Sequence, residues 1–186
     1  MTPEQKEAYR QSLIKHFANC NSCYFVTLRM KQSYMGKFVD FMSAPDNATY
    51  FYNILNSYIF GNNAKRNGRL INAVMNVEKD SAFHAHMIIE IPTLSGGKTF
   101  KEIMIGRMRK KNFKEEKIAA FENRFKHYSD DLFFQQLIKM AWKCTHFGKA
   151  IVHKDIHYRD VFNIDGSVDY LLKRNGKENL LYFGSN

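Results

Sequence analysis

Hydrophobic residues recur at helical spacing in several parts of the chain. In residues 3–18, Leu13, Ile14 and Phe17 follow this spacing while lysine and arginine occupy other positions, which predicts an amphipathic helix. Capping and helix-breaking residues mark the ends of similar segments. The basic stretch after Gly97 is also expected to be helical. The expected helices cover residues 3–18, 44–60, 114–128, 130–146 and 165–174.

Strand-forming residues cluster in other segments. Residues 84–91 are mostly apolar after two histidines, and Pro92 is expected to end that strand. Residues 79–82 separate it from the preceding strand and predict a hairpin turn. The expected strands cover residues 24–28, 70–77, 84–91 and 150–156, and a further strand begins at residue 180.

The order of these elements is strand, helix, hairpin, helices, strand and helix. It predicts an α+β fold with an antiparallel sheet. The chain has 186 residues and contains no internal repeat, low-complexity tract or interdomain linker. One domain over residues 1–186 is therefore expected.

The charge balance changes the expected partner. Lysine and arginine number 28 against 18 aspartate and glutamate residues, giving a formal net charge of +10. A field of this sign attracts polyanions, which favours a nucleic-acid partner. The densest basic run contains Arg107, Arg109, Lys110 and Lys111. We expect these four side chains to contact a DNA backbone, the alternative being a solvated helix face.

Cysteine content and hydropathy indicate the compartment. The three cysteines cannot form a closed disulfide framework, so a reducing, cytoplasmic setting is expected. No run of about 18 apolar residues is present, and the N-terminus lacks the apolar region of a signal peptide. We therefore expect no membrane partner.

Two histidines and a glutamate form a candidate metal site. His84 and His86 lie two positions apart on an expected strand, so both imidazoles point to one face and can bind one divalent ion. Hairpin pairing can bring Glu78 beside His84. Two imidazoles and a carboxylate with open coordination positions suit Mn²⁺ or Mg²⁺. Asp169 is the alternative third ligand, and an ordinary exposed turn carboxylate is the alternative interpretation of Glu78.

A tyrosine and a lysine share one face of the last expected helix. Tyr170 and Lys173 are three positions apart, so the phenol and the ammonium project together. A phenol, with an ordinary pKa near 10, is an effective nucleophile only when a cation or a polarised electrophile assists it. The structural alternative is a packed tyrosine with a solvated lysine.

Three short motifs follow one another in a characteristic order. They are the strand Phe25–Leu28 with its interior threonine, His-Ala-His at 84–86, and Tyr-Leu-Leu-Lys at 170–173. This ordered set resembles the His-hydrophobe-His (HUH) endonucleases, and most of all the single-tyrosine rolling-circle replication initiators of plasmids and small phages. The resemblance implies an RRM-like, five-stranded antiparallel sheet with flanking helices. It also implies that His84 and His86 are metal ligands, Tyr170 is the nucleophile and Lys173 is an auxiliary group.

The resemblance implies a function as well. The implied function is that of a metal-dependent, sequence-specific endonuclease and strand transferase for single-stranded DNA. Such an enzyme initiates rolling-circle replication through a 5′-phosphotyrosine intermediate. The implied partners are origin DNA, which can carry a hairpin, and a host helicase and polymerase in a bacterial cytoplasm. A relaxase or transposase of the same superfamily is a related alternative. A non-catalytic, RRM-like nucleic-acid-binding module is an alternative of a different class.

Overall fold

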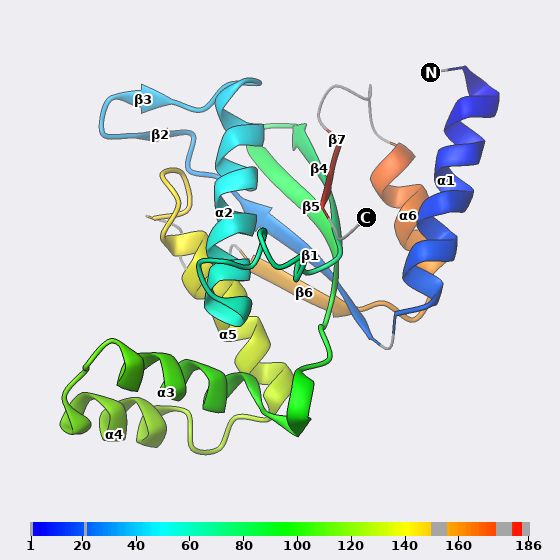
Figure 1. Ribbon diagram of the computed structural model, residues 1–186. Helices are drawn as coiled ribbons and strands as arrows, with labels where there is room; N and C mark the ends of the chain where they lie inside the picture. The colour runs from blue at the N-terminus through cyan, green and yellow to red at the C-terminus, as the bar shows by residue number, and fades with distance from the viewer. Residues whose placement is uncertain (1, 21, 150–155, 174–179, 184–186) are drawn as a thin grey trace.

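A five-stranded sheet runs through the centre of the structure, with helices on both of its faces (Figure 1). The computed structural model describes residues 2–20, 22–149, 156–173 and 180–183. The strands have the spatial order β6-β1-β5-β4-β7, and each strand is antiparallel to its neighbours. The predicted α+β fold with an antiparallel sheet is therefore confirmed. The strands are β1 (Cys23–Arg29), β4 (Ala73–Lys79), β5 (Phe83–Glu90), β6 (Ile156–Asp160) and β7 (Leu180–Phe183).

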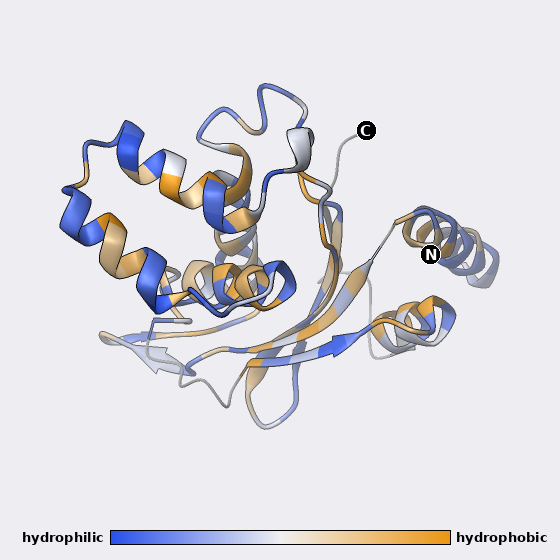
Figure 2. Ribbon diagram, turned by 90° about the horizontal axis from the view of Figure 1, so that it is seen from below, coloured by the Kyte–Doolittle hydropathy of each residue, from blue (hydrophilic) through white to orange (hydrophobic). Residues whose placement is uncertain are grey.

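The helices form two groups, one on each face of the sheet (Figure 2). Helices α1 and α6 pack together on one face, whereas α2 and α5 cover the other. Helices α3 and α4 lie outside α2 and α5. The helices are α1 (Pro3–Ala18), α2 (Ser43–Phe60), α3 (Phe100–Lys110), α4 (Glu115–Arg124), α5 (Asp130–Lys143) and α6 (Ile164–Lys173), with a short 3₁₀ turn at Ser95–Gly97.

Strand β5 divides its side chains between two hydrophobic cores. Ala85, Met87 and Ile89 belong to the larger core beneath α2 and α5. Ile88 belongs to the smaller core beneath α1 and α6. Because successive strand residues point to opposite faces, His84 and His86 extend from the same face as Ile88. The two histidines therefore lie at the end of the smaller core.

Side-chain caps define where several helices begin. Thr2 and Gln5 form a capping box at the start of α1, and Thr99 and Glu102 form another at the start of α3. Each box satisfies backbone N–H groups that have no partner within the helix. The Ser129 hydroxyl accepts from the backbone of the first turn of α5.

The edge strand β6 differs from its sequence prediction. The prediction placed a strand at 150–156, of which residues 150–155 lie outside the described part of the structure. The described strand covers Ile156–Asp160, and its exposed His157 and Arg159 alternate with the inward-facing Ile156 and Tyr158. An edge strand tolerates polar side chains on the face that is exposed to solvent. Residues 157–160 therefore lack the continuous apolar pattern that predicts a buried strand.

A short hairpin of β2 (Ser33–Tyr34) and β3 (Lys37–Phe38) also escaped prediction. Its turn is formed by Met35 and Gly36, both with positive φ. Tight hairpins usually mark this geometry with Asn-Gly or Asp-Gly. The Met-Gly pair lacks that signal, which is why the hairpin was not recognised.

Within the described residues, no helix combines the length and the apolar character needed to cross a membrane.

Ile88 provides a test of the smaller core. Its side chain is fully buried beside Val168 and Leu171 of α6. Ile88→Ala is expected to lower the free energy of unfolding by about 2–5 kcal/mol, and Ile88→Val by about 0.5–1.5 kcal/mol, because each leaves a cavity. Urea denaturation followed by circular dichroism measures both values. Wild-type stability in Ile88→Ala would contradict the packing described here.

Candidate metal and tyrosine site

The imidazoles of His84 and His86 lie side by side on β5. Their ring centroids are 4.7 Å apart. His86 is 6% exposed and His84 is partly buried. The strand geometry predicted from the sequence therefore brings both rings to one face of the sheet.

Glu78 completes a group of three potential metal ligands. It is the direct cross-strand partner of His84 in the β4–β5 pairing and is only 3% exposed. Glu78 Oε2 lies 3.7 Å from His84 Nε2 and 3.8 Å from His86 Nε2. One ligand atom from each residue lies within 4.8 Å of the others. Glu78, His84 and His86, hereafter the metal group, can therefore hold a metal ion.

Hydrogen bonds orient both imidazoles toward Glu78. His84 Nδ1 lies 3.0 Å from the carbonyl oxygen of Ala82. Because a carbonyl oxygen only accepts, Nδ1 donates there, and in the neutral imidazole Nε2 then carries the lone pair that can bind a metal. His86 Nδ1 lies 3.0 Å from Thr27 Oγ1, which can accept in the same way. Such outer partners hold metal-binding histidines in the ligating tautomer.

Asn76 connects the metal group to α6. Its side-chain amide donates to Glu78 Oε1 at 3.0 Å and to the carbonyl oxygen of Leu171 at 2.8 Å. Asn76 is buried and precedes Glu78 by two positions, so both side chains point to the same face of β4. Asn76 is not among the site residues that the sequence predicts. That two-residue spacing was the signal available to find it.

Tyr170 lies directly beside the metal group. Its ring meets the His86 ring edge to face, with centroids 5.0 Å apart, and meets Phe25 in the same manner at 5.5 Å. Tyr170 remains 43% exposed, so reactants can reach it from solvent. Lys173 ends α6, and its side chain lies outside the described part of the structure.

Asp169, the alternative third ligand, faces α1. Its carboxylate accepts from the Arg10 guanidinium through both oxygens, with Arg10 Nη2 3.1 Å from Oδ2. This hydrogen-bonded ion pair lowers the pKa of Asp169 below its ordinary value. Asp169 therefore joins α6 to α1, and the described structure does not include it in the metal group.

The basic run predicted to bind DNA lies on the other side of the sheet. Arg107, Arg109 and Lys110 are on α3 and Lys111 caps its end, and α3 packs on α2 and α5. The Arg107 guanidinium donates to the Ser57 carbonyl oxygen, and Arg109 Nε lies 3.9 Å from Glu115 Oε1. The structure does not bring these four residues together with the metal group.

The edge strand β6 presents other polar residues near the metal group. His157 pairs with Thr27 and Arg159 pairs with Phe25 across the β1–β6 ladder, and both polar side chains are exposed. They line a hollow of about 480 Å³ together with Phe25 and Thr27. Neither residue is among the predicted site residues, because the sequence pattern predicts no strand over residues 157–160.

Tyr158, which precedes Tyr170 by 12 positions, packs on the opposite face of the sheet. Its hydroxyl donates to the carbonyl oxygen of Gln135 at 3.1 Å, on the face covered by α5. Burial raises the pKa of this phenol above its ordinary value. Tyr158 is therefore a suitable control for Tyr170.

Loss of a ligand or of its outer partner should weaken metal binding to different degrees. Thr27→Val is expected to weaken Mn²⁺ binding by about 10–100-fold, because the imidazole of His86 loses its orienting partner. His84→Ala and Glu78→Ala are expected to weaken it further. His157→Ala, which removes a nearby exposed imidazole, is the matched control. Isothermal titration calorimetry with MnCl₂ measures the affinities, and wild-type affinity in His84→Ala would contradict the ligand assignment.

The Arg10–Asp169 ion pair predicts a pH-dependent stability. Because the pKa of Asp169 is lowered in the folded state, the pair stabilises the fold above the unfolded pKa, about 3.9. Its contribution is lost as the pH falls through the folded pKa. Urea unfolding is measured from pH 7 to pH 2. Wild type should be more stable than Asp169→Asn near pH 7, and the two free energies of unfolding should converge only in acid. A stability difference that is unchanged across this range would contradict the assignment.

Comparisons with known proteins leave the chemistry to be inferred from these residues. No protein-family model, curated protein or solved structure matches the chain. The features that bear on a function are the three potential ligand atoms of the metal group, their burial and the adjoining phenol of Tyr170.

Proposed function

We propose that the protein is a metal-dependent endonuclease and strand transferase that nicks single-stranded DNA and initiates rolling-circle replication. The observation that carries the proposal is the position of Tyr170, whose ring lies 5.0 Å from that of His86 and remains open to solvent. An exposed phenol beside a buried Glu/His/His group has the components for metal-assisted attack on a phosphodiester.

The residues of the metal group suit a divalent ion. Their donor atoms are two imidazole nitrogens and a carboxylate oxygen, a set that Mn²⁺ accepts, with Mg²⁺ as the alternative. Glu78, His84 and His86 would hold the ion. When bound, it supplies positive charge that polarises a non-bridging oxygen of the scissile phosphate.

Tyr170 is the proposed nucleophile. Its Oη attacks phosphorus, a P–Oη bond forms and the P–O3′ bond breaks. The phenolic proton passes to solvent, and the departing 3′ oxygen takes up a proton to become a hydroxyl. The product is a 5′-phosphotyrosine, whose phosphodiester bond replaces the one that was broken. A later 3′-hydroxyl can therefore reverse the step and join two strands, and the free 3′-hydroxyl can prime synthesis.

Lys173 is the proposed auxiliary group. It follows Tyr170 by three positions on α6, a spacing at which two helical residues are neighbours on one face. An ammonium there favours the negative charge that develops on the phosphate and on the attacking oxygen.

The proposed path of the DNA strand crosses β1 and β6 beside Tyr170. Arg159 and His157 are exposed there, and Phe25 contacts the Tyr170 ring. A guanidinium can bind the phosphate backbone, and an aromatic ring can stack on a base. This surface replaces the α3 basic run as the proposed substrate contact, because α3 packs on the other face of the sheet.

The covalent adduct separates the proposed enzyme from a binding module. With Mn²⁺ and single-stranded oligonucleotides, wild type should form an adduct that persists on a denaturing gel. Tyr170→Phe should abolish it while DNA affinity changes by less than about threefold, because only the hydroxyl is removed. Tyr158→Phe, which alters a partly buried phenol on the other face of the sheet, should retain it.

Three results would contradict the proposal. One is an undiminished adduct in Tyr170→Phe, and another is an adduct that forms equally well in EDTA. The third is DNA retention without adduct across a library of origin-like sequences. That third result would favour the non-catalytic nucleic-acid-binding module.

A further inference from the structure

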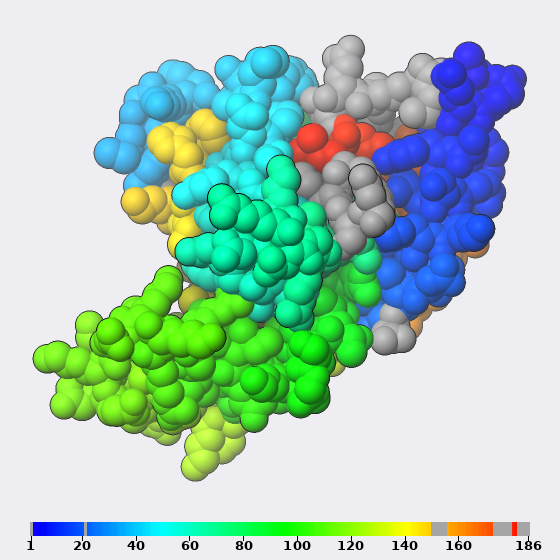
Figure 3. All heavy atoms as spheres, in the orientation of Figure 1, coloured from blue at the N-terminus to red at the C-terminus, as the bar shows by residue number. Residues whose placement is uncertain are grey.

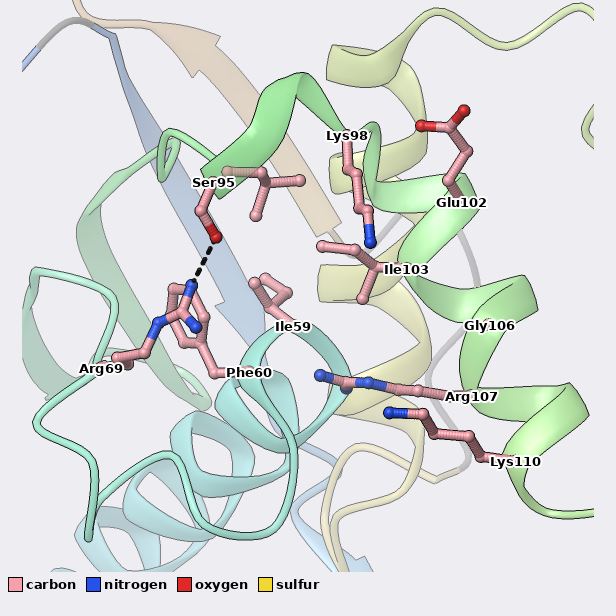
Figure 4. A pocket seen from close by; sticks show the side chains of 11 residues that line it. Ile59, Phe60, Arg69, Ser95, Lys98, Glu102, Ile103, Gly106, Arg107 and Lys110 are labelled. Atoms are coloured by element: carbon pink, nitrogen blue, oxygen red, sulfur yellow. Dashed lines mark hydrogen bonds between the residues drawn. The ribbon is translucent and has the colours of Figure 1, made fainter.

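A hollow of about 460 Å³ lies between the end of α2 and the side of α3 (Figure 4). Ile59 and Phe60 form part of its wall from α2, and Arg69 approaches from the segment after α2. In Figure 3 the 61–70 segment, in teal, lies against the green α3–α4 pair on one surface of the molecule. These helices cover the face of the sheet opposite to α1 and α6, so this α2–α3 hollow is separate from the metal group.

Positive charge dominates the lining of the α2–α3 hollow. Among its described lining residues, Glu102 is the one acidic side chain. Its carboxylate is engaged in the helix cap, where Oε2 accepts from the Thr99 backbone N–H at 2.8 Å and from the Thr99 hydroxyl at 3.1 Å. The cationic lining residues are Arg69, Lys98, Arg107 and Lys110.

Arg107 is the most desolvated of these cations. It is half-buried, its guanidinium donates to the Ser57 carbonyl oxygen, and burial lowers its pKa. Within the described residues, no carboxylate lies at ion-pair distance from Arg107. A partly buried charge without a counter-charge is costly. An anionic ligand in the hollow would provide that counter-charge.

The remaining lining is mostly apolar, with Ser95 as its polar member, and leaves room on α3. Phe60 and Ile103, which are partly exposed, supply its accessible apolar surface, whereas Ile59 is only 2% exposed. Gly106 faces this space, and a Cβ placed there would meet no other atom within 4 Å. The hollow therefore combines a cationic rim with an apolar floor that can accept a flat or bulky group.

We propose that the α2–α3 hollow binds a nucleotide, with its phosphate among Arg107, Lys110 and Lys98 and its base and sugar against Phe60 and Ile103. Guanidinium and ammonium groups are the usual phosphate ligands. Inorganic phosphate alone would leave the apolar floor uncovered, which is why we infer an organic phosphate. A free mononucleotide and a nucleotide within a single strand both present this chemistry.

The α2–α3 hollow can bind a nucleotide whether or not the metal group takes part in nicking. The hollow and the metal group lie on opposite faces of the sheet, so one can bind its ligand when the other does not. Titrations carried out in EDTA keep the metal group from contributing through a bound ion.

Two adjacent lysines give a matched comparison. Lys110 lines the hollow, whereas Lys111, which is also exposed, is not among its lining residues. Changing either to glutamine removes one positive charge from the end of α3. Lys110→Gln is expected to weaken nucleotide binding about fivefold to tenfold, because a charge-assisted hydrogen bond is lost. Lys111→Gln should change it by less than about twofold, through screened charge alone.

A second variant tests the shape of the hollow without changing its charge. Gly106→Met fills the open space on α3 and favours the helix, so it is expected to preserve folding and to weaken binding more than about tenfold by occupying the site. Thermal unfolding followed by circular dichroism checks that each variant is folded.

The ligands are dAMP, an oligo(dA) of about ten nucleotides and inorganic phosphate, measured by calorimetry or anisotropy in EDTA. If Lys110→Gln and Gly106→Met weaken the binding of dAMP, the result supports a free nucleotide as the ligand. If the two variants weaken the binding of oligo(dA) and dAMP itself does not bind, the result supports a nucleotide within a strand. Equal losses in Lys110→Gln and Lys111→Gln would overturn the site in favour of general charge attraction. Unchanged binding in Gly106→Met, or inorganic phosphate binding as tightly as dAMP, would overturn it too.

Discussion

The register between β4 and β5 is the constraint on which the metal group depends. Glu78 and His84 are direct partners in this ladder, so three ligand atoms meet without any loop having to position them. A slip of one residue would turn Glu78 to the opposite face of the sheet. Val77 and Ala85, also direct partners, are buried in the larger core and oppose such a slip. The packing of one face therefore determines the chemistry available on the other.

A second set of contacts joins this sheet-based group to the tyrosine helix. The buried amide of Asn76 bonds both Glu78 and the Leu171 carbonyl, one residue after Tyr170. The Arg10–Asp169 pair fastens the outer side of α6 to α1. Sites on rigid elements hold their geometry better than sites on loops. The phenol and the ligand atoms thus share one framework, although about 84 residues separate His86 from Tyr170 along the chain.

Local pattern in the sequence was sufficient to predict the potential metal ligands, but not the residues around them. Strand periodicity predicted that His84 and His86 share a face, and hairpin pairing predicted Glu78 beside them. The hydrogen bonds that Thr27 and Asn76 make to the metal group depend on which strands are neighbours in the sheet. Local periodicity does not encode that order. Likewise, nothing in the basic run of α3 reveals which face of the sheet it will cover. Helix packing decides that, and it separates the run from Tyr170.

The central claim is that the phenol of Tyr170 and the metal group form one reaction centre. Tandem mass spectrometry of the nuclease- and protease-digested covalent complex tests this claim most directly. We predict a nucleotide linked through its 5′-phosphate to the peptide at Tyr170, and its loss when Glu78 or His84 is replaced by alanine. A nucleotide linked to any other residue, or one at Tyr170 that persists in those variants, would contradict the account.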